Sequence, residues 1–227
     1  MTRPLLFFDL DDTLVDHHAA EEVAHRETYA SHASLFGGVA FEEWLASYRR
    51  NNLRLWNAYG KGEIDRPTLA ARRFALPLAE LGLDAAGGAA ASAFYIGAYS
   101  RSWRLIEDAE DVLEHASRSG VVGILSNGFR QTQRAKIERF GLDRWARHVV
   151  LSEEVGAMKP SRAIFDAASR AAGGDARRRV YVGDSFATDV VGAKGAGWFP
   201  ILFDRHGTGA PEPVVFVTRL ADLKPLL

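Results

Sequence analysis

The stretch that decides the fold is residues 5–14, LLFFDLDDTL, in which a short apolar run ends abruptly in three carboxylates. Such a run predicts a buried strand, and an open α/β sheet binds its ligands at the carboxyl ends of its strands. Asp9 and Asp11 would share a face if the strand continued through them. Neighbouring carboxylates repel and need a cation or a proton between them. The stretch thus predicts a cation-assisted site with a nucleophile and an acid/base group, although a solvated acidic turn would also fit.

The second half of the chain alternates helical patterns with short apolar runs. Strands are predicted at 121–125, 148–151, 180–182 and 199–203. Helices are predicted at 108–119, 130–140, 161–172 and 187–196. This alternation is typical of a parallel sheet with helices on both faces, and the opening strand would belong to the same sheet. The predicted fold class is therefore α/β, with a Rossmann-like parallel sheet.

The intervening segment shows helical patterns and no such strands. Apolar side chains recur at helical spacing between Phe41 and Tyr59. Asp65 with Pro67 indicates the start of another helix, and Pro77 is expected to kink or end it. Residues 84–99 are alanine-rich and favour a further helix. We therefore expect an α/β catalytic core formed by residues 1–15 and 103–227, with a helical domain inserted at residues 16–102.

Composition narrows the functional classes. The chain has 227 residues, a formal net charge of -1 and no cysteine. Near-neutral charge gives no attraction to nucleic acid polymers or to an anionic membrane. The lack of cysteine excludes disulfides, thiolate metal sites and cysteine nucleophiles. The apolar stretch before Asp9 is too short for a signal peptide or a membrane span, so we expect a cytoplasmic protein.

Three further polar groups follow predicted strands. Ser126-Asn127-Gly128 offers a hydroxyl and backbone N–H groups to an anion, although Asn-Gly is also a common turn. Lys159-Pro160 offers a cation ahead of a helix, where a lone lysine is usually solvated. Asp184 and Asp189 flank a strand-helix turn, where acids often cap helices. Taken together, the four groups in this order predict one active site, which combines a nucleophile, an acid/base group, a hydroxyl, a cation and metal ligands.

With these motifs the chain resembles the haloacid dehalogenase superfamily of phosphohydrolases. DLDDTL at 9–14 is similar to the first motif of that family, LSNG at 125–128 to the second, Lys159-Pro160 to the third and residues 183–189 to the fourth. The helical insertion looks like the family's first type of cap. Shorter strings at 55–62, 126–129 and 152–160 are similar to bacterial pyrimidine nucleotide 5′-monophosphatases, and sialic-acid phosphate phosphatases carry related strings.

The resemblance implies Mg²⁺-dependent hydrolysis of a phosphomonoester through an aspartyl-phosphate. Asp9 would attack phosphorus, and Asp11 would protonate the leaving oxygen and later deprotonate the attacking water. Mg²⁺ would be held by Asp9, the backbone carbonyl of Asp11 and Asp184. Asp189 would bind the metal directly or act through a water or Lys159.

The resemblance also implies how the phosphate is held. Lys159 and Ser126 would bind its oxygens together with the N–H groups of Asn127 and Gly128. If the strand continued to Asp12, strand alternation would place it on the face opposite to Asp9 and Asp11, and we assign it a structural role.

The predicted partner is a small phosphorylated metabolite, with nucleoside 5′-monophosphates ahead of sugar phosphates. Side chains that could contact the leaving group are His17, His18, Arg49, Arg54, Trp56, Tyr59, Tyr95, Phe129 and Arg130. Aromatic residues at helical spacing more often belong to a core, so this set has two interpretations. The protein is expected to be a monomer or a homodimer.

Other functions stay open at this point. A sugar phosphatase or a phosphomutase would share all four motifs. A 2-haloacid dehalogenase needs the aspartate nucleophile but no metal and no second acid, so Asp11 and Asp184 argue against it. A non-catalytic binding module usually lacks the nucleophile or a metal acid, and this chain retains both.

Overall fold

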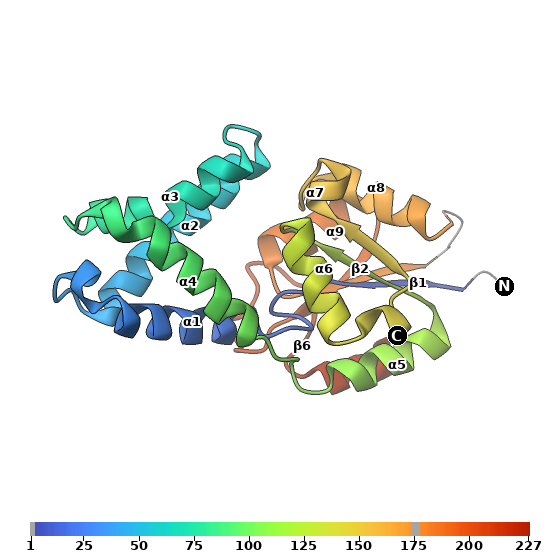
Figure 1. Cartoon of the computed structure of the whole chain (residues 1–227). Helices are drawn as coiled ribbons and strands as arrows, with labels where there is room; N and C mark the ends of the chain where they lie inside the picture. Colours follow the sequence, from blue (N-terminus) through green and yellow to red (C-terminus); the bar gives the residue numbers. More distant parts are fainter. Residues whose placement is uncertain (1–2, 174–177) are drawn as a thin grey trace. The chain divides into compact units, whose positions relative to one another are not determined.

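The computed structural model describes residues 3–173 and 178–227, and it divides the chain into two compact units. One unit combines Met1–Asp16 with Arg104–Leu227, and the other is His17–Trp103 (Figure 1). The chain therefore passes from the first unit to the second and back again.

The first unit is built on six parallel strands in the order β3-β2-β1-β4-β5-β6. Their bounds are β1 Leu5–Phe8, β2 Val121–Ser126, β3 His148–Leu151, β4 Arg179–Gly183, β5 Phe199–Phe203 and β6 Val215–Val217. The predicted fold class is confirmed. Strand β6 was not predicted, because three residues at a sheet edge are too few to show a periodic pattern.

Strand β1 lies in the middle of the sheet and is buried on both faces, as expected for a parallel strand without polar residues. Phe7 of β1 is level with Gly123 of β2. A Cβ at position 123 would lie 2.3 Å from the Phe7 ring, so glycine is required there. Phe7 also packs edge-to-face on Trp198, with ring centroids 5.3 Å apart. These contacts anchor the strand that leads into the acidic stretch.

Within the described residues, five helices and short helical turns flank the sheet. The helices are α5 Ala109–Ser119, α6 Arg130–Arg139, α7 Ser152–Val155, α8 Arg162–Ala171 and α9 Val191–Gly195. In Figure 1, α5 and α6 lie on one side of the sheet, and α7, α8 and α9 on the other. A core cluster that includes Phe7, Phe165, Tyr181 and Trp198 packs α8 and α9 against the strands.

The helix predicted at 187–196 is present, but its two halves are of different types. Residues Phe186–Val190 form a π-helical turn, and α9 starts only at Val191. The backbone N–H groups of Asp189 and Val190 both donate to the carbonyl of Ser185. This wide turn directs the side chain of Asp189 away from the position that a regular helix would give it.

The second unit contains the helices α1 His17–Ser31, α2 Phe41–Gly60, α3 Arg66–Glu80 and α4 Gly88–Arg101. Asp65 caps α3 by accepting the N–H of Thr68 at 2.9 Å. The helix does not end at Pro77 but continues to Glu80. Pro77 lies in the last turn of the helix, where its missing N–H leaves out one backbone hydrogen bond.

An aromatic cluster forms the core of this unit. The ring of His25 is fully buried among Trp44, Tyr48, Phe74 and Tyr95, and Trp44 Nε1 donates to His25 Nδ1 at 3.3 Å. Burial, together with nearby arginine charges, lowers the pKa of His25 to about 3. The histidine is therefore a neutral core residue at physiological pH.

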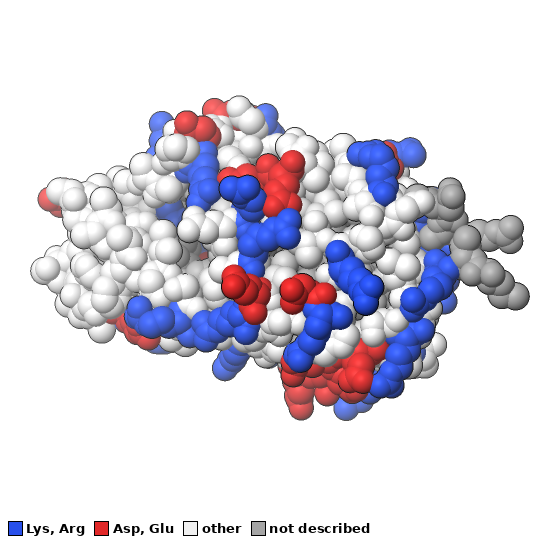
Figure 2. All heavy atoms as spheres, turned by 45° about the vertical axis from the view of Figure 1, so that its right-hand side comes forward, with Lys and Arg blue, Asp and Glu red and all other residues white. Residues whose placement is uncertain are grey.

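Charges of both signs are mixed on the face of the molecule seen in Figure 2. Surface ion pairs between described residues include Arg134 with Glu154 and Lys194 with Glu212. Such a face carries no large field of one sign. Of the helices formed by residues 3–173 and 178–227, none combines the length and the apolar character needed to cross a membrane.

Candidate active site

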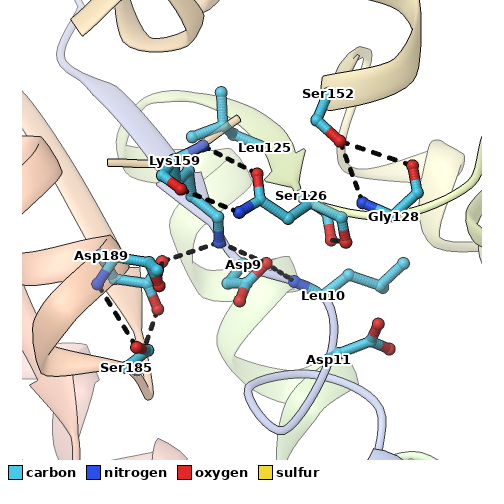
Figure 3. A network of polar contacts seen from close by, with 12 residues as sticks. Asp9, Leu10, Asp11, Leu125, Ser126, Gly128, Ser152, Lys159, Ser185 and Asp189 are labelled. Carbon is cyan, nitrogen blue, oxygen red and sulfur yellow. Dashed lines mark hydrogen bonds and ion pairs between the residues drawn. The ribbon is translucent and has the colours of Figure 1, made fainter. Parts of the chain in front are cut away.

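The predicted site residues gather at the carboxyl ends of three neighbouring strands. Asp9 directly follows β1, Ser126 ends β2, and Asp184 directly follows β4. Since β2, β1 and β4 are adjacent and parallel, these positions lie next to one another at the carboxyl ends of the central strands. Lys159 reaches the same place from the segment before α8, as Figure 3 shows.

Lys159 is the centre of the polar network. Its Nζ lies 2.9 Å from Asp9 Oδ1, 2.7 Å from Asp189 Oδ1 and 2.9 Å from the hydroxyl of Tyr181. The side chain is 2% exposed. Although burial alone disfavours the ammonium, the charges of Asp189 and Asp9 raise the pKa of Lys159 above its ordinary value. The lysine is therefore a fixed positive charge beside Asp9.

Two side chains hold Lys159 in place. Asn127 accepts the backbone N–H of Lys159 on Oδ1 at 2.8 Å and donates Nδ2 to the Lys159 carbonyl at 3.1 Å. Asn127 was expected to offer its own N–H to phosphate, and its side chain turns out to organise the lysine segment. The Tyr181 hydroxyl donates to the carbonyl of Leu125 at 2.7 Å while it accepts from Lys159. The sequence analysis missed Tyr181, because an apolar strand gives no sign of which phenol reaches a polar group.

Three carboxylates lie close enough to share one cation. Asp9, Asp184 and Asp189 each present an oxygen, and these atoms lie within 4.8 Å of one another. Burial, reinforced by Asp189 and opposed by Lys159, raises the pKa of Asp9 to about 7. Burial and the neighbouring acids raise the pKa of Asp184 well above its usual value. One ammonium does not balance three carboxylates, so the donor set and its charge fit a divalent cation with oxygen ligands.

Asp189 has a partner on each oxygen. Oδ1 contacts Lys159, and Oδ2 accepts the N–H of Ser185 at 2.9 Å. A Cβ at Gly183 would lie 2.3 Å from Asp189 Oδ2, so only glycine admits this carboxylate. The π-helical turn and Gly183 together bring the carboxylate of Asp189 into contact with the ammonium of Lys159.

Asp11 does not belong to the group of three acids. Strand β1 ends at Phe8, so the strand alternation expected for Asp9 and Asp11 does not apply. Residues 10–15 fold into a tight turn, in which the N–H groups of Leu14 and Val15 donate to the carbonyl of Leu10 and Asp12 has a φ of 56°. In Figure 3 the Asp11 carboxylate points away from that of Asp9.

The side chain of Asp11 meets two residues of α6 that the sequence analysis missed. It forms an ion pair with Lys136 and accepts Gln133 Nε2 at 2.9 Å. Gln133 also donates to Ser126 Oγ at 2.9 Å, which links Asp11 to the predicted phosphate-binding hydroxyl. Both residues lie in the helix that follows the Ser126 motif, but the sequence alone does not distinguish the buried Lys136 from the exposed Arg130 and Arg134 of the same helix.

The Gly128 N–H does not face the predicted phosphate position. It donates to Ser152 Oγ at 3.0 Å, which ties the loop after β2 to the start of α7. Binding of phosphate by the hydroxyl of Ser126 and the N–H of Asn127 stays a prediction.

Several side chains predicted to contact a leaving group have other partners. Tyr95 is buried beside His25, Arg49 pairs with Glu21 at 2.8 Å, and His17 Nδ1 lies 2.7 Å from the Tyr99 hydroxyl. Tyr95 is therefore a core residue. The rest of this set stays a prediction: His17, His18, Arg49, Arg54, Trp56, Tyr59, Phe129 and Arg130.

Comparison with known proteins gives a consistent set of similarities. A family model described as haloacid dehalogenase-like hydrolase matches residues 4–197. The pyrimidine 5′-nucleotidase YjjG of Escherichia coli is 30% identical over 98% of this chain and 96% of its own length. A glyceraldehyde 3-phosphate phosphatase of Pyrococcus abyssi is 31% identical over 88% of this chain and 80% of its own.

Solved structures agree on the fold. The structure of YfnB from Bacillus subtilis, bound to magnesium, has a TM-score of 0.81 at 24% identity and covers 100% of this chain and 99% of its own. A 2-haloacid dehalogenase from Pseudomonas syringae has a TM-score of 0.68 at 24% identity, covering 100% of this chain and 98% of its own. At these identities the likeness concerns the fold alone.

Proposed function

Since the chain belongs to the haloacid dehalogenase-like hydrolase family and is a phosphatase, we propose that it is a Mg²⁺-dependent phosphomonoesterase acting on nucleoside 5′-monophosphates through an aspartyl-phosphate. The observation that carries this proposal is the buried contact of Asp9 with Lys159 at the carboxyl edge of the sheet. A carboxylate nucleophile with an adjacent fixed cation is what attack on a phosphate dianion requires.

In the proposed reaction, Asp9 attacks phosphorus and the bond between phosphorus and the ester oxygen breaks. Asp11 donates a proton to the departing oxygen. Asp11 then takes a proton from a water, which attacks the aspartyl-phosphate and releases inorganic phosphate and free Asp9. Lys159 and Ser126 bind the phosphate oxygens and stabilise the charge that develops on them.

Mg²⁺ would be held by Asp9, Asp184 and the backbone carbonyl of Asp11, and when bound it would neutralise charge between the acids and the phosphate. Both oxygens of Asp189 already have partners, so we assign Asp189 to the orientation of Lys159. The acidic cluster supports the proposed Mg²⁺ site, because without a cation its carboxylates are brought together at an electrostatic cost.

Two relatives named as pyrimidine 5′-nucleotidases support the substrate class. The similarity to YjjG extends over nearly the whole chain and therefore includes residues 17–103. A sugar phosphatase is the second candidate, favoured by the similarity to glyceraldehyde 3-phosphate phosphatases. The dehalogenase alternative has only the shared fold in its support, and Asp11 and Asp184 have no role in that chemistry.

The test is phosphate release with Mg²⁺ from uridine 5′-monophosphate, thymidine 5′-monophosphate, glyceraldehyde 3-phosphate and a phosphopeptide. We expect the two nucleotides to have the highest kcat/KM. A higher value for glyceraldehyde 3-phosphate would replace the nucleotidase by the sugar phosphatase, and a higher value for the phosphopeptide would overturn the assignment to small metabolites.

The mechanism is tested separately with Asp9→Asn, which should lose hydrolysis of every substrate because an amide is not an anionic nucleophile. Asp166→Asn is the matched control, since Asp166 is a surface residue paired with Arg162. Near-normal turnover by Asp9→Asn would exclude the covalent mechanism.

A further inference from the structure

Helix α6 carries two buried polar side chains that the proposed reaction does not use. Gln133 and Lys136 are each 1% exposed, in a helix whose other polar side chains are mostly accessible. They are three residues apart and therefore share one face of the helix. Burial of a lysine is costly unless its charge is paired, so this position calls for a specific partner.

The partner is the carboxylate of Asp11. Lys136 Nζ forms the ion pair with Asp11 Oδ1, and Gln133 Nε2 donates to Asp11 Oδ2 at 2.9 Å. Each carboxylate oxygen thus has its own donor from α6. Two donors on two different oxygens define the plane of the carboxylate as well as its position.

In the ion pair of Lys136 with Asp11, only the Asp11 side chain is accessible to solvent. The side chain of Lys136 is 1% exposed, whereas that of Asp11 is 26% exposed. The cation therefore lies beneath the carboxylate, which keeps an accessible edge. Because Gln133 Nε2 also donates to Ser126 Oγ at 2.9 Å, the carboxylate is held next to the hydroxyl proposed to bind phosphate.

Asp11 lies outside the central strand that leads to Asp9, in the turn formed by residues 10–15. Asp9 directly follows the central strand and its N–H donates to the carbonyl of Val182, whereas Asp11 lies in the turn beyond the strand. A side chain on a turn is free to rotate unless other groups fix it. A misplacement of about 1 Å in a reacting group can lower a rate about 100-fold.

We propose that Lys136 and Gln133 are positioning residues that fix the carboxylate of Asp11 beside Ser126. The proposal rests on the function of Asp11 as acid and base proposed above. It assigns to α6 a role in the reaction, in which the buried cation acts through Asp11 and does not touch the substrate.

The test compares two aryl phosphates, so that it does not depend on which metabolite is the natural substrate. The nitrophenolate of p-nitrophenyl phosphate leaves without a proton, whereas the phenolate of phenyl phosphate leaves faster with one. Rapid mixing measures the burst of phenol release, the steady-state rate and the fraction of acid-quenched phosphoenzyme. The variants are Lys136→Met, Lys136→Arg and Gln133→Leu, with Lys194→Met as the surface control and Asp11→Asn as the reference.

In Lys136→Met we expect a nearly unchanged burst with p-nitrophenyl phosphate, a steady-state rate at least about tenfold lower, and more accumulated phosphoenzyme. With phenyl phosphate the burst itself should slow by at least about tenfold. Lys136→Arg should recover part of both rates, because it restores the cation. Gln133→Leu should show the same pattern and serves as the test if Lys136→Met does not fold.

A merely structural role would give a different result. Lower burst amplitudes with both esters, without more phosphoenzyme, would overturn the proposal, as would wild-type kinetics in Lys136→Met and Gln133→Leu. Failure of the proposed function has its own signature, which is normal turnover by Asp11→Asn. That outcome would remove the positioning role together with the acid/base assignment.

Discussion

Asp9 is buried beside two other acids, and its carboxylate contacts the ammonium of Lys159. In the absence of a metal ion, burial raises the pKa of Asp9 from 3.8 to about 7. The folded protein therefore binds more protons than the unfolded chain between these two values, and stability falls as the pH rises through this range. Above pH 7 the full destabilising effect of the ionised Asp9 is present.

Asp9→Asn should consequently be more stable than the wild type in a chelator at pH 8, although it lacks activity. The amide keeps the shape of the carboxylate and carries no charge, and Lys159 retains its contacts with Asp189 and Tyr181. The difference in melting temperature should shrink as the pH is lowered from 7 towards 4. Thermal unfolding at several pH values measures it, and an Asp9→Asn protein that melts below the wild type at pH 8 would contradict the argument.

At the scale of elements, the packing of α1 to α4 depends on a histidine that stays neutral. His25 is fully buried, and its pKa in the folded protein is about 3, compared with 6.5 in an unfolded chain. The unfolded chain therefore takes up a proton first as the pH falls. The contribution of neutral His25 to the stability of the folded protein is complete above pH 6.5 and is lost progressively between pH 6.5 and 3.

We expect the unit His17–Trp103 to lose about 2 kcal/mol of stability between pH 7 and pH 5 through His25 alone. His25→Phe should remove this dependence, since a phenyl ring fits the aromatic cluster and does not titrate. Tryptophan fluorescence during unfolding reports on the cluster through Trp44. The control is His206→Gln, at an exposed position, which should keep the wild-type dependence, and an unchanged pH profile in His25→Phe would refute the assignment.

Helix α9 contains two glycines with opposite requirements. A Cβ at Gly192 would lie 2.6 Å from the ring of Phe165 and 3.0 Å from Cα of Pro160, whereas a Cβ at Gly195 would meet nothing within 4 Å. Gly195→Ala should stabilise the protein by about 0.5–1 kcal/mol through the lower entropy of the unfolded chain. Gly192→Ala should destabilise it by about 1–3 kcal/mol through overpacking. Chemical denaturation of both variants measures the difference, and equal effects would contradict it.

At the scale of the whole molecule, the chain leaves the first unit after Asp16, forms a helical unit and returns to the first unit at Arg104. All residues proposed to bind Mg²⁺ lie in the first unit. A ligand that binds only the folded state at about 100 times its dissociation constant stabilises a protein by about 2.7 kcal/mol. Mg²⁺ should therefore act on stability as well as on activity.

We expect Mg²⁺ to raise the melting temperature of the wild type and to support hydrolysis, and a chelator to abolish both effects. Asp184→Asn should show a much smaller rise, because it lacks one of the proposed ligands. Ca²⁺ should support hydrolysis poorly, since its larger coordination shell disturbs an in-line reaction. Full hydrolysis in excess chelator would exclude the metal assignment.

The alternation of apolar runs with helical patterns was sufficient to predict the α/β fold. Each short run, such as residues 5–8, is locally unambiguous, and parallel strands joined by helices bring their carboxyl ends to one edge. For this reason Asp9, Ser126, Lys159 and Asp184 could be predicted to meet before any coordinates were known. Their chemical roles, the oligomeric state and the location in the cell stay predictions.

Only the tertiary structure decided which polar side chains are buried around these residues. Tyr181, Gln133 and Lys136 give no local signal, because their burial depends on which face of a strand or helix packs against the sheet. The end of β1 at Phe8 separates Asp11 from Asp9, and the π-helical turn aims Asp189 at Lys159. The physical reason is that hydrophobic periodicity determines elements locally, whereas hydrogen bonds between distant residues form only once those elements have packed.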